Sequence, residues 1–376
     1  MATAVKSKPR MQHHRLLAPV LQPPFANEIP IDLGPVQGKS AVSLLWRRLR
    51  PAVSLALRRQ FPLQREQIGR NLRRALWIYK GSPQIGDSLM DLASRVLLAQ
   101  HGIKVDLCTD LHLARLYHAD DVFSNVFSDA SQLAPHDYDL VILDSFKGRC
   151  LEDKFRYLPH LPFVTMRGYF SGPEFNRTLF SFCRMNQLLD IGVSDAQLHA
   201  RALPHLCSSQ ADREAVAALM IPNGSIALAI GGASPGRTYQ RWDQVAAKLL
   251  QSNTSNNLVL LGSNNANAMR DAILHASKEH AIRIIDCVDR HTLTQTFEIL
   301  RRCTLAVAAD GGLLHIANAA GIPTVALFDR HIAPALRLTA ANRSITVQSA
   351  GTISDIGVDE VVHSIEQAIA REQPVR

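Results

Sequence analysis

Apolar and polar residues alternate in blocks over most of the chain, and the blocks follow two periods. Short uninterrupted apolar runs bounded by turn residues predict buried strands, whereas apolar residues at intervals of three and four predict helices. In the first half of the chain this pattern predicts strands within 75–79, 101–110 and 136–146, and a helix at 87–100. The stretch from 151 to 212 is less regular, and we expect loops and helices there.

A second alternating series begins at Gly224. Its predicted strands are 225–232, 257–263, 282–287 and 304–309, and its predicted helices are 241–251, 267–276, 291–303, 313–320 and 358–371. Strands that alternate with helices form parallel, doubly wound sheets, so the expected fold class is α/β with two Rossmann-like lobes in tandem. Ligands of such sheets bind beyond the carboxyl ends of the strands, which predicts a site in a cleft between the lobes.

This organisation predicts three parts of the chain. Residues 1–74 form a basic N-terminal extension that is helical or partly disordered, 75–212 form an N-terminal acceptor lobe, and 213–376 form a C-terminal donor lobe. The last helix is expected to fold back across the lobe junction.

The positive charge of the chain is concentrated in the extension. Residues 1–74 hold 14 Lys and Arg against 3 Asp and Glu, whereas the whole chain has a net charge of +8, so the remainder is slightly acidic. Aromatic residues that stack on bases are sparse in the extension. Because of both features we do not expect nucleic acid as a partner.

The extension also contains an apolar repeat at helical spacing among arginines. The repeat is Leu45, Leu49, Val53 and Leu57, and the arginines are Arg47, Arg48, Arg50, Arg58 and Arg59. Such a segment suits the surface of an anionic membrane, where lipid-linked acceptors are found. Pro51 interrupts the repeat and is expected to begin a second helix. The alternative is a pair of helices packed on the catalytic lobes or on a partner subunit.

Other features of the composition point to the cytoplasm. The six cysteines are scattered without a C-x-x-C pair, which is typical of a reduced compartment. No apolar run approaches the length of a membrane span, and the short run 16–21 is broken by Pro19, so a secretory signal is not expected. No metal motif stands in a suitable setting, and no cofactor is expected.

Asp310, Gly311 and Gly312 form a polar break between a predicted strand and a predicted helix. A strand-to-helix turn of this kind presents free backbone N–H groups and the positive end of a helix dipole, and it favours a diphosphate. Leu313 would add an amide, and His315 lies on the first helical turn. The alternative is that the glycines only shape a tight turn and that His315 is a core histidine.

Asp87 has the corresponding position in the first lobe, after a strand and at the opening of a helix. It is either a general base that projects into the cleft or an N-cap residue. Asp91, one turn later, either shares this site or is a solvated helical residue, and we favour the solvated interpretation. Lys147 and Arg149, just beyond a strand, are either contacts for an anionic acceptor or parts of a solvated loop.

The third element is the Gly-rich loop GGASPGRTYQRWDQ, which follows a predicted strand. Ser234, Arg237 and Arg241 would offer a hydroxyl and two guanidinium groups to phosphate oxygens. The loop is neither a Walker loop nor a G-x-G-x-x-G fingerprint. A surface loop with ordinary arginines is the alternative.

Together these segments resemble glycosyltransferase family 9, the ADP-heptose:lipopolysaccharide heptosyltransferases and their relatives. The resemblance rests on four motifs and extends over about 75–367. The motifs are Gly86-Asp87, the strand 138–142, the 232–234 loop leading to Arg241-Trp242, and the segment 310–328, which is the most specific.

The resemblance implies a GT-B architecture and an inverting, metal-independent transfer from a nucleoside-diphosphate sugar, by default ADP-heptose, to a lipopolysaccharide-type or other glycan or glycolipid acceptor. It assigns the catalytic base to Asp87, and the nucleotide contacts to Asp310, Gly311, Gly312, Leu313 and His315.

This chain departs from the family pattern on the donor side. Gln240 replaces a usual lysine, so Arg237 or Arg241 must substitute for it. Residues 264–267 lack the usual acidic groups, and 329–331 read DRH in place of GPT. Two alternatives therefore stay open: a nucleotide-sugar epimerase or hydrolase of the same fold, and a non-catalytic nucleotide-binding relative.

Overall fold

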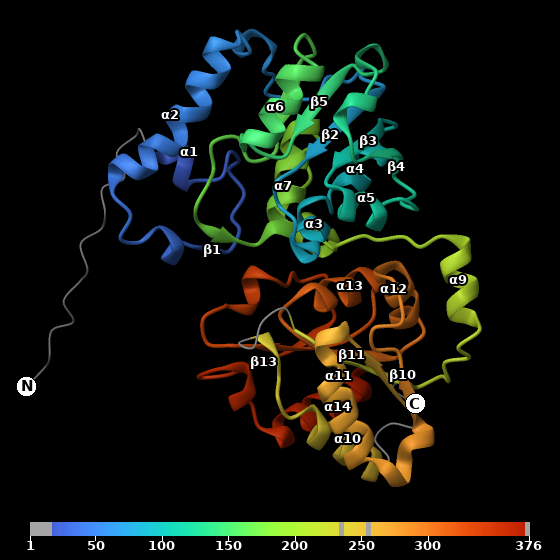
Figure 1. The fold of residues 1–376 in the computed structure, drawn as a ribbon. Helices are drawn as coiled ribbons and strands as arrows, with labels where there is room; N and C mark the ends of the chain where they lie inside the picture. The colour runs from blue at the N-terminus through green and yellow to red at the C-terminus, as the bar shows by residue number, and fades with distance from the viewer. Residues whose placement is uncertain (1–16, 233–236, 253–256, 373–376) are drawn as a thin grey trace, which may run out of the picture.

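The computed structural model describes residues 17–232, 237–252 and 257–372, and it consists of two lobes, one above the other in Figure 1. Each lobe is built around one parallel sheet covered by helices. This arrangement confirms the predicted α/β fold class with two doubly wound lobes.

The sheet of the N-terminal lobe has the strand order β4-β3-β2-β5-β6, and all its pairs are parallel. The direction of winding reverses between β2 and β5, which is the place where doubly wound sheets bind ligands. The strands are β2 (Arg74–Tyr79), β3 (Lys104–Thr109), β4 (Phe123–Phe127), β5 (Leu140–Leu143) and β6 (Phe163–Thr165), and the helices are α3 (Ile85–Asp91), α4 (Arg95–Gln100), α5 (Leu111–Leu116), α6 (Gly148–Tyr157), α7 (Arg177–Leu189) and α8 (Asp195–Arg201).

The sheet of the C-terminal lobe has the order β10-β9-β8-β11-β12-β13, again with parallel pairs only. Its winding reverses between β8 and β11. The strands are β8 (Ile226–Ala229), β9 (Leu258–Leu261), β10 (Ile284–Asp286), β11 (Leu305–Ala309), β12 (Thr324–Phe328) and β13 (Ser344–Gln348), and the helices are α9 (Gln210–Ala217), α10 (Trp242–Gln251), α11 (Asn267–Ala276), α12 (Leu293–Arg301), α13 (Gly312–Ala320) and α14 (Val358–Glu372).

The helix predicted at 87–100 is divided into α3 and α4. Leu92 closes α3 with its backbone outside the helical region, and the Ser181 hydroxyl of α7 donates to the Asp91 carbonyl at 2.6 Å. Because the Asp91 carbonyl already accepts this hydrogen bond, it needs no helical amide as a donor, and the chain turns before α4 begins. The break depends on a residue far away in the sequence.

The predicted N-terminal pair of helices is one continuous helix, α2 (Ala41–Leu57), which contains Pro51. Ser40 caps it by accepting from the Ser43 amide at 3.2 Å. Pro51 is buried together with Leu44 and Leu55, and this packing stabilises the helix although proline removes one internal hydrogen bond. The alternative that the extension packs on a lobe therefore holds for this face of α2.

The rest of the N-terminal segment is also attached to the N-terminal lobe. Helix α1 (Ala18–Leu21) contacts α2, and β1 (Ile31–Asp32) pairs antiparallel with β7 (Glu174–Phe175). The segment thus lies against the lobe from α1 to β2.

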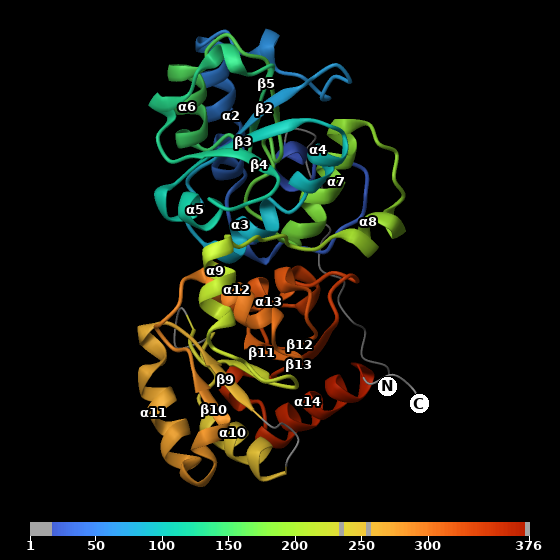
Figure 2. The ribbon, with the colours of Figure 1, turned by 90° about the vertical axis from the view of Figure 1, so that its right-hand side faces the viewer.

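The last helix does not fold back across the junction, and this prediction is wrong. Helix α14 packs on α10, β11, β12 and β13 of its own lobe (Figure 2), because its buried side chains, such as Val361 and Ile365, complete the apolar cluster there. Among the described residues, no helix has both the length and the apolar character needed to cross a membrane.

The two lobes meet through α3 and α13, which face each other in Figures 1 and 2. The Asn176 side chain donates to the carbonyls of Ala335 and Leu338 at 2.7 and 2.8 Å, and Arg337 pairs with Glu174 at 2.8 Å. The predicted boundary at 212 falls inside α9, which packs on α12. The ends of the parallel strands in both lobes are thereby brought to one junction.

Candidate active site at the lobe junction

A cavity of about 310 Å³ opens where β8, β9, β10 and β11 end. Its walls come from the residues that follow each of these strands, and from Ile85 of α3 in the opposite lobe. The C-terminal lining is Ala229, Gly231, Gly232, Arg237, Gly262, Ser263, Asn265, Asp289, His291, Leu293, Thr296, Ala309, Asp310, Gly311, Gly312, Leu313 and Ile316. The cavity lies at the reversal of winding, as expected for this fold.

Gly311 and Gly312 leave the N-terminus of α13 uncovered. Gly311 caps the helix without a side-chain hydrogen bond, and its φ of 168° is an extended conformation that any residue adopts. A Cβ added to Gly312 would meet no protein atom within 4 Å. Packing therefore does not demand glycine here, and the space before the helix amides is open to an anion, which disfavours the tight-turn alternative.

Asp310 is buried and borders the same cavity. One carboxylate oxygen lies 3.3 Å from Arg337, and the other has no hydrogen-bond partner among the described residues. Since Arg337 also pairs with Glu174, it joins the donor-side turn to the N-terminal lobe. Asp310 thus holds one buried oxygen without a partner at the edge of the cavity.

His315 lies beneath the turn and touches the other lobe. Its side chain is buried, and burial lowers its pKa to about 4, so the imidazole is neutral near pH 7. Its Nδ1 has no hydrogen-bond partner among the described residues. A Cβ built on Gly86 would lie only 2.7 Å from its Cδ2 atom, so the two lobes are in direct contact here.

Asp87 is the third residue of α3, and Gln84 is the N-cap, so the N-cap alternative is wrong. Its carboxylate pairs with Arg177 at 3.1 Å and keeps 29% of its side-chain exposure. Burial raises the pKa of Asp87, and Arg177 partly opposes this effect. Asp87 is therefore a partly accessible carboxylate beside the donor cavity.

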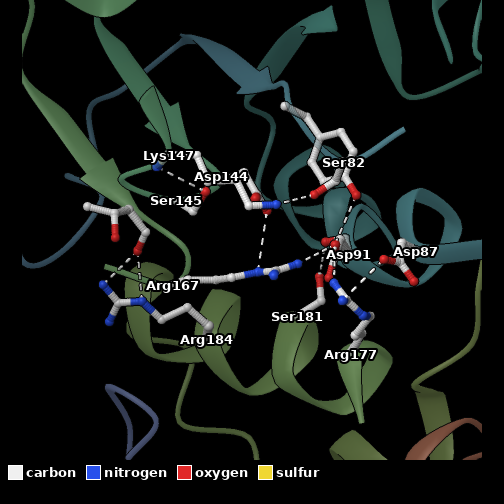
Figure 3. Close-up of polar contacts among 12 residues, drawn as sticks. Ser82, Asp87, Asp91, Asp144, Ser145, Lys147, Arg167, Arg177, Ser181 and Arg184 are labelled. Atoms are coloured by element: carbon white, nitrogen blue, oxygen red, sulfur yellow. Dashed lines mark hydrogen bonds and ion pairs between the residues drawn. The ribbon is translucent and has the colours of Figure 1, made fainter. Parts of the chain in front are cut away.

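Asp91 is the centre of a buried charge network (Figure 3), so its interpretation as a solvated residue is wrong. Arg177 lies between Asp87 and Asp91, 3.0 Å from the latter, and Arg167 and the Tyr79 hydroxyl also bind Asp91. Burial raises the pKa of Asp91, but the charges of Arg167 and Arg177 outweigh it and lower the pKa.

No local motif marked Arg177 in the sequence, because it comes from α7, distant from Asp87 along the chain. The buried Asp91 carboxylate holds the Arg177 guanidinium in place, and Arg177 in turn orients Asp87.

Arg237 and Arg241 lie in different places. Arg237 lines the donor cavity. The Arg241 guanidinium instead donates to the Ser354 carbonyl, with Nε at 3.1 Å, and lies over the Tyr239 ring. Its side chain turns toward the segment before α14, so Arg237 is the better placed of the two for a phosphate, and the contact through Arg241 stays a prediction. Ser234 lies outside the described residues.

An acidic side chain lines the cavity although residues 264–267 have none. Asp289, from the loop after β10, lines it together with His291. The Asn265 side-chain amide donates to the Gly232 carbonyl at 2.6 Å, and this hydrogen bond joins the loops that follow β8 and β9. Sequence inspection missed Asp289 because the relevant loop follows a different strand.

A second and larger cavity, about 790 Å³, lies between α2 and the N-terminal lobe. Its cations come from two sources: α2 contributes Arg47, Arg50 and Arg58, and the lobe contributes Lys147, Arg167 and Arg177. Lys147 also binds the Gly81 carbonyl and the Ser82 hydroxyl. Arg149 lies outside this cavity, 3.5 Å from Asp110. The cavity reaches Arg177, the partner of Asp87, while Asp87 itself is not among its lining residues.

One group among the described residues has the composition of a metal site, namely Asp121, His205 and Cys207. Its atoms already bond to one another, with His205 Nε2 at 2.8 Å from Asp121 and 3.4 Å from Cys207. It lies outside the lining of both cavities.

Residues 205–354 match the model of glycosyltransferase family 9 (heptosyltransferase). The C-terminal lobe is a family 9 glycosyltransferase domain. This match includes the cavity and the turn at Asp310, and it confirms the predicted family and the predicted enzyme class, a glycosyltransferase.

Solved structures support the same fold over both lobes. A glycosyl transferase of family 9 from Veillonella parvula has a TM-score of 0.66 at 15% identity, with 82% of this chain and 100% of that chain covered. The ADP-heptose LPS heptosyltransferase II of E. coli has a TM-score of 0.61 at 18% identity, with 80% and 99% covered. The E. coli heptosyltransferase WaaC with ADP has a TM-score of 0.55 at 15% identity, with 79% and 100% covered. The predicted GT-B architecture is confirmed. No curated protein sequence matches the chain significantly.

Proposed function

We propose that the protein is an inverting glycosyltransferase that moves a sugar from a nucleoside-diphosphate donor in the C-terminal cavity to an acceptor in the N-terminal cavity. The observation that carries the proposal is the meeting of α3 and α13. Ile85 lines the donor cavity, Gly86 touches His315, and Asp87 follows directly. A carboxylate and an open anion site thus lie on either side of one junction.

Asp87 acts as the general base in this mechanism. The acceptor hydroxyl attacks the anomeric carbon, Asp87 accepts its proton, and the bond to the diphosphate breaks through a transition state with oxocarbenium character. The raised pKa of Asp87 makes the carboxylate a better proton acceptor, and a base of this kind contributes about 10²–10⁴ in rate. Arg177 keeps the carboxylate oriented and ionised.

The leaving diphosphate is stabilised by donors that the fold holds in place. The amides of Gly311, Gly312 and Leu313 begin α13, and Arg237 adds a guanidinium to the lining of the same cavity. Donors arranged before the reaction are often the largest catalytic contribution. His315 takes part as a neutral imidazole, and Asp310 offers its unpartnered oxygen to the ribose.

The proposed donor is an ADP-linked heptose. The solved relatives support this choice, since one is the E. coli heptosyltransferase WaaC with ADP-2-deoxy-2-fluoro heptose. In this chain, Asp289 and Asn265 line the cavity and suit the hydroxyls and base of a nucleoside. The acceptor is proposed to be a lipopolysaccharide-type glycan or glycolipid, in keeping with the cationic lining of the larger cavity.

Two other functions predict different outcomes. An epimerase or hydrolase would consume the donor without an acceptor, and a non-catalytic relative would bind nucleotide without turnover. Arg237 and Asp289 supply in the cavity the charges that Gln240 and 264–267 lack, which favours an active enzyme. A cytoplasmic location with peripheral membrane contact also remains a proposal.

Calorimetric binding of ADP, GDP, UDP and CDP tests the donor site. We expect selective binding of ADP that is lost in Asp310→Ala and kept in Asp121→Asn, which changes an exposed carboxylate outside both cavities. Failure of all four nucleotides to bind at millimolar concentration would refute the donor site.

Turnover of ADP-heptose, with and without acceptor, then tests the reaction. Asp87→Asn is expected to lower the rate of transfer about 10²–10⁴-fold while ADP affinity stays unchanged. Donor consumption that does not depend on the acceptor would favour the hydrolase or epimerase instead.

A further inference from the structure

Helix α2 presents a continuous apolar stripe to the outside of the molecule. Among the described residues, eight large hydrophobic side chains are exposed, and five of them belong to this one helix: Val42, Trp46, Leu49, Val53 and Leu57, at 77%, 63%, 41%, 53% and 79% exposure. A sixth, Phe61, follows in the next turn. Exposed apolar residues that gather in one place mark an interaction surface.

The stripe lies on a single face of the helix. Its members are spaced by four, three, four and four residues, which puts them on one side, while Leu44, Pro51 and Leu55 are buried on the opposite side. Leu55 belongs to the core cluster of the N-terminal lobe, and Leu44 packs with α1. Figure 1 shows α2 at the outer margin of that lobe. The helix is thus held by one face, and the described part of the chain leaves the other face exposed.

The charges of α2 all have one sign. Its sequence, AVSLLWRRLRPAVSLAL, contains arginines and no acidic residue. Arg50 lies beside the stripe, whereas the Arg47 guanidinium turns toward Gly172 of the lobe, and Arg58 and Arg59 follow at the end of the helix. An apolar face flanked by arginines suits a bilayer with anionic lipids, because the guanidinium charges are attracted to the lipid headgroups.

We infer that α2 docks on the surface of an anionic phospholipid membrane, with Val42, Trp46, Leu49, Val53 and Leu57 placed between the lipid headgroups. The helix then lies parallel to the membrane, because its other face is fixed to the N-terminal lobe. This docking is independent of the transfer reaction, and only its use for the acceptor rests on the proposed function.

Docking would bring the larger cavity to the level of the headgroups. Arg47, Arg50 and Arg58 line that cavity and lie on the same helix as the stripe. The cavity continues to Arg177, the partner of Asp87. A glycolipid acceptor anchored in the membrane would thereby reach the proposed base without leaving the bilayer.

The intrinsic fluorescence of the full-length protein tests this inference. The chain has three tryptophans, of which Trp46 is exposed while Trp77 and Trp242 are buried. A change of emission on addition of vesicles therefore reports Trp46. With phosphatidylcholine vesicles that contain phosphatidylglycerol, we expect a blue shift, quenching by brominated lipid, and co-sedimentation that weakens with salt.

Two matched variants locate the contact. Val53→Ser combined with Leu57→Ser removes two exposed apolar side chains, and we expect vesicle binding at least tenfold weaker. Leu111→Ser is the control, because Leu111 is also exposed, at 58%, but lies on α5. Circular dichroism and ADP affinity are expected to match the wild type in both variants.

Three results would overturn the inference: no shift and no co-sedimentation with anionic vesicles, equal binding to pure phosphatidylcholine, or a shift that appears with protein concentration alone. The last result would assign the stripe to a second copy of the chain. If ADP fails to bind while vesicle docking persists, the proposed function fails and the membrane contact stands.

Discussion

Gly86 and His315 touch across the lobe junction, and Gly86→Ala tests how closely the lobes must meet. The added Cβ would lie 2.7 Å from His315 Cδ2, whereas carbon atoms in contact stay about 3.5–4.0 Å apart. The imidazole is buried and cannot simply swing away. Helices α3 and α13 must therefore separate by roughly 1 Å, the difference between these distances.

The displacement has two expected effects. Overpacking of this kind lowers the free energy of unfolding by about 1–3 kcal/mol. Because Asp87 follows Gly86 directly, the proposed base moves with it, and a misplacement of about 1 Å lowers the transfer rate by about 100-fold. ADP affinity should change less, since the α13 amides stay with their own lobe.

A double-mutant cycle isolates the contact. His315→Ala removes the ring, so Gly86→Ala should lower the free energy of unfolding less in the His315→Ala background than in the wild type. We expect a coupling of about 1 kcal/mol or more in denaturant unfolding. Gly69→Ala is the control, because its added Cβ would meet no protein atom within 4 Å and Gly69 lines neither cavity. Wild-type stability and turnover in Gly86→Ala, or a cycle without coupling, would refute the proposed junction.

Three further predictions follow from the same geometry. Arg237→Gln should weaken ADP binding by about tenfold or more while Arg241→Gln leaves it unchanged, because only Arg237 lines the cavity; equal losses in calorimetry would contradict this. Arg177→Gln should move the acidic limb of the pH profile of kcat/KM to higher pH, since Arg177 lowers the pKa of Asp87, and an unmoved limb would argue against Asp87 as the base. The pKa of His315 is lowered from 6.5 to about 4 in the folded protein, so between these pH values only the unfolded chain takes up the proton. The free energy of unfolding should therefore fall by about 3 kcal/mol as the pH drops from 6.5 to 4. In urea titrations, His315→Gln should remove this part of the fall.

The donor site shows how much of a binding site the local sequence pattern predicts. The apolar run before Asp310 and the helix after Gly312 were predictable because hydrophobic periodicity and glycine act over a few residues. It was not predictable that Arg237 rather than Arg241 lines the cavity, because the two lie four positions apart in one loop. They differ only in the fold, where the Arg241 guanidinium donates to the Ser354 carbonyl.

The acceptor side depended almost wholly on distant contacts. Asp87 was marked by its position after a strand, but Arg177 and Arg167, which bind its neighbour Asp91, come from other elements and carry no local signal. Pro51 predicts a helix break because proline has no backbone N–H to donate. The burial of Leu44 and Leu55 beside it outweighs this preference, and the helix continues.

The sequence by itself determined the alternation of strands and helices, the two-lobed α/β class and the open turn at Gly311 and Gly312, because these follow from the period of apolar residues and from backbone freedom. It did not predict the strands β4, β6, β12 and β13. The tertiary structure alone decided which side chains meet: Gly86 with His315, Arg177 with Asp87, and Asp289 within the donor cavity. Burial and the electrostatics of charge pairs act through space between residues far apart in the chain, so no local pattern contains them.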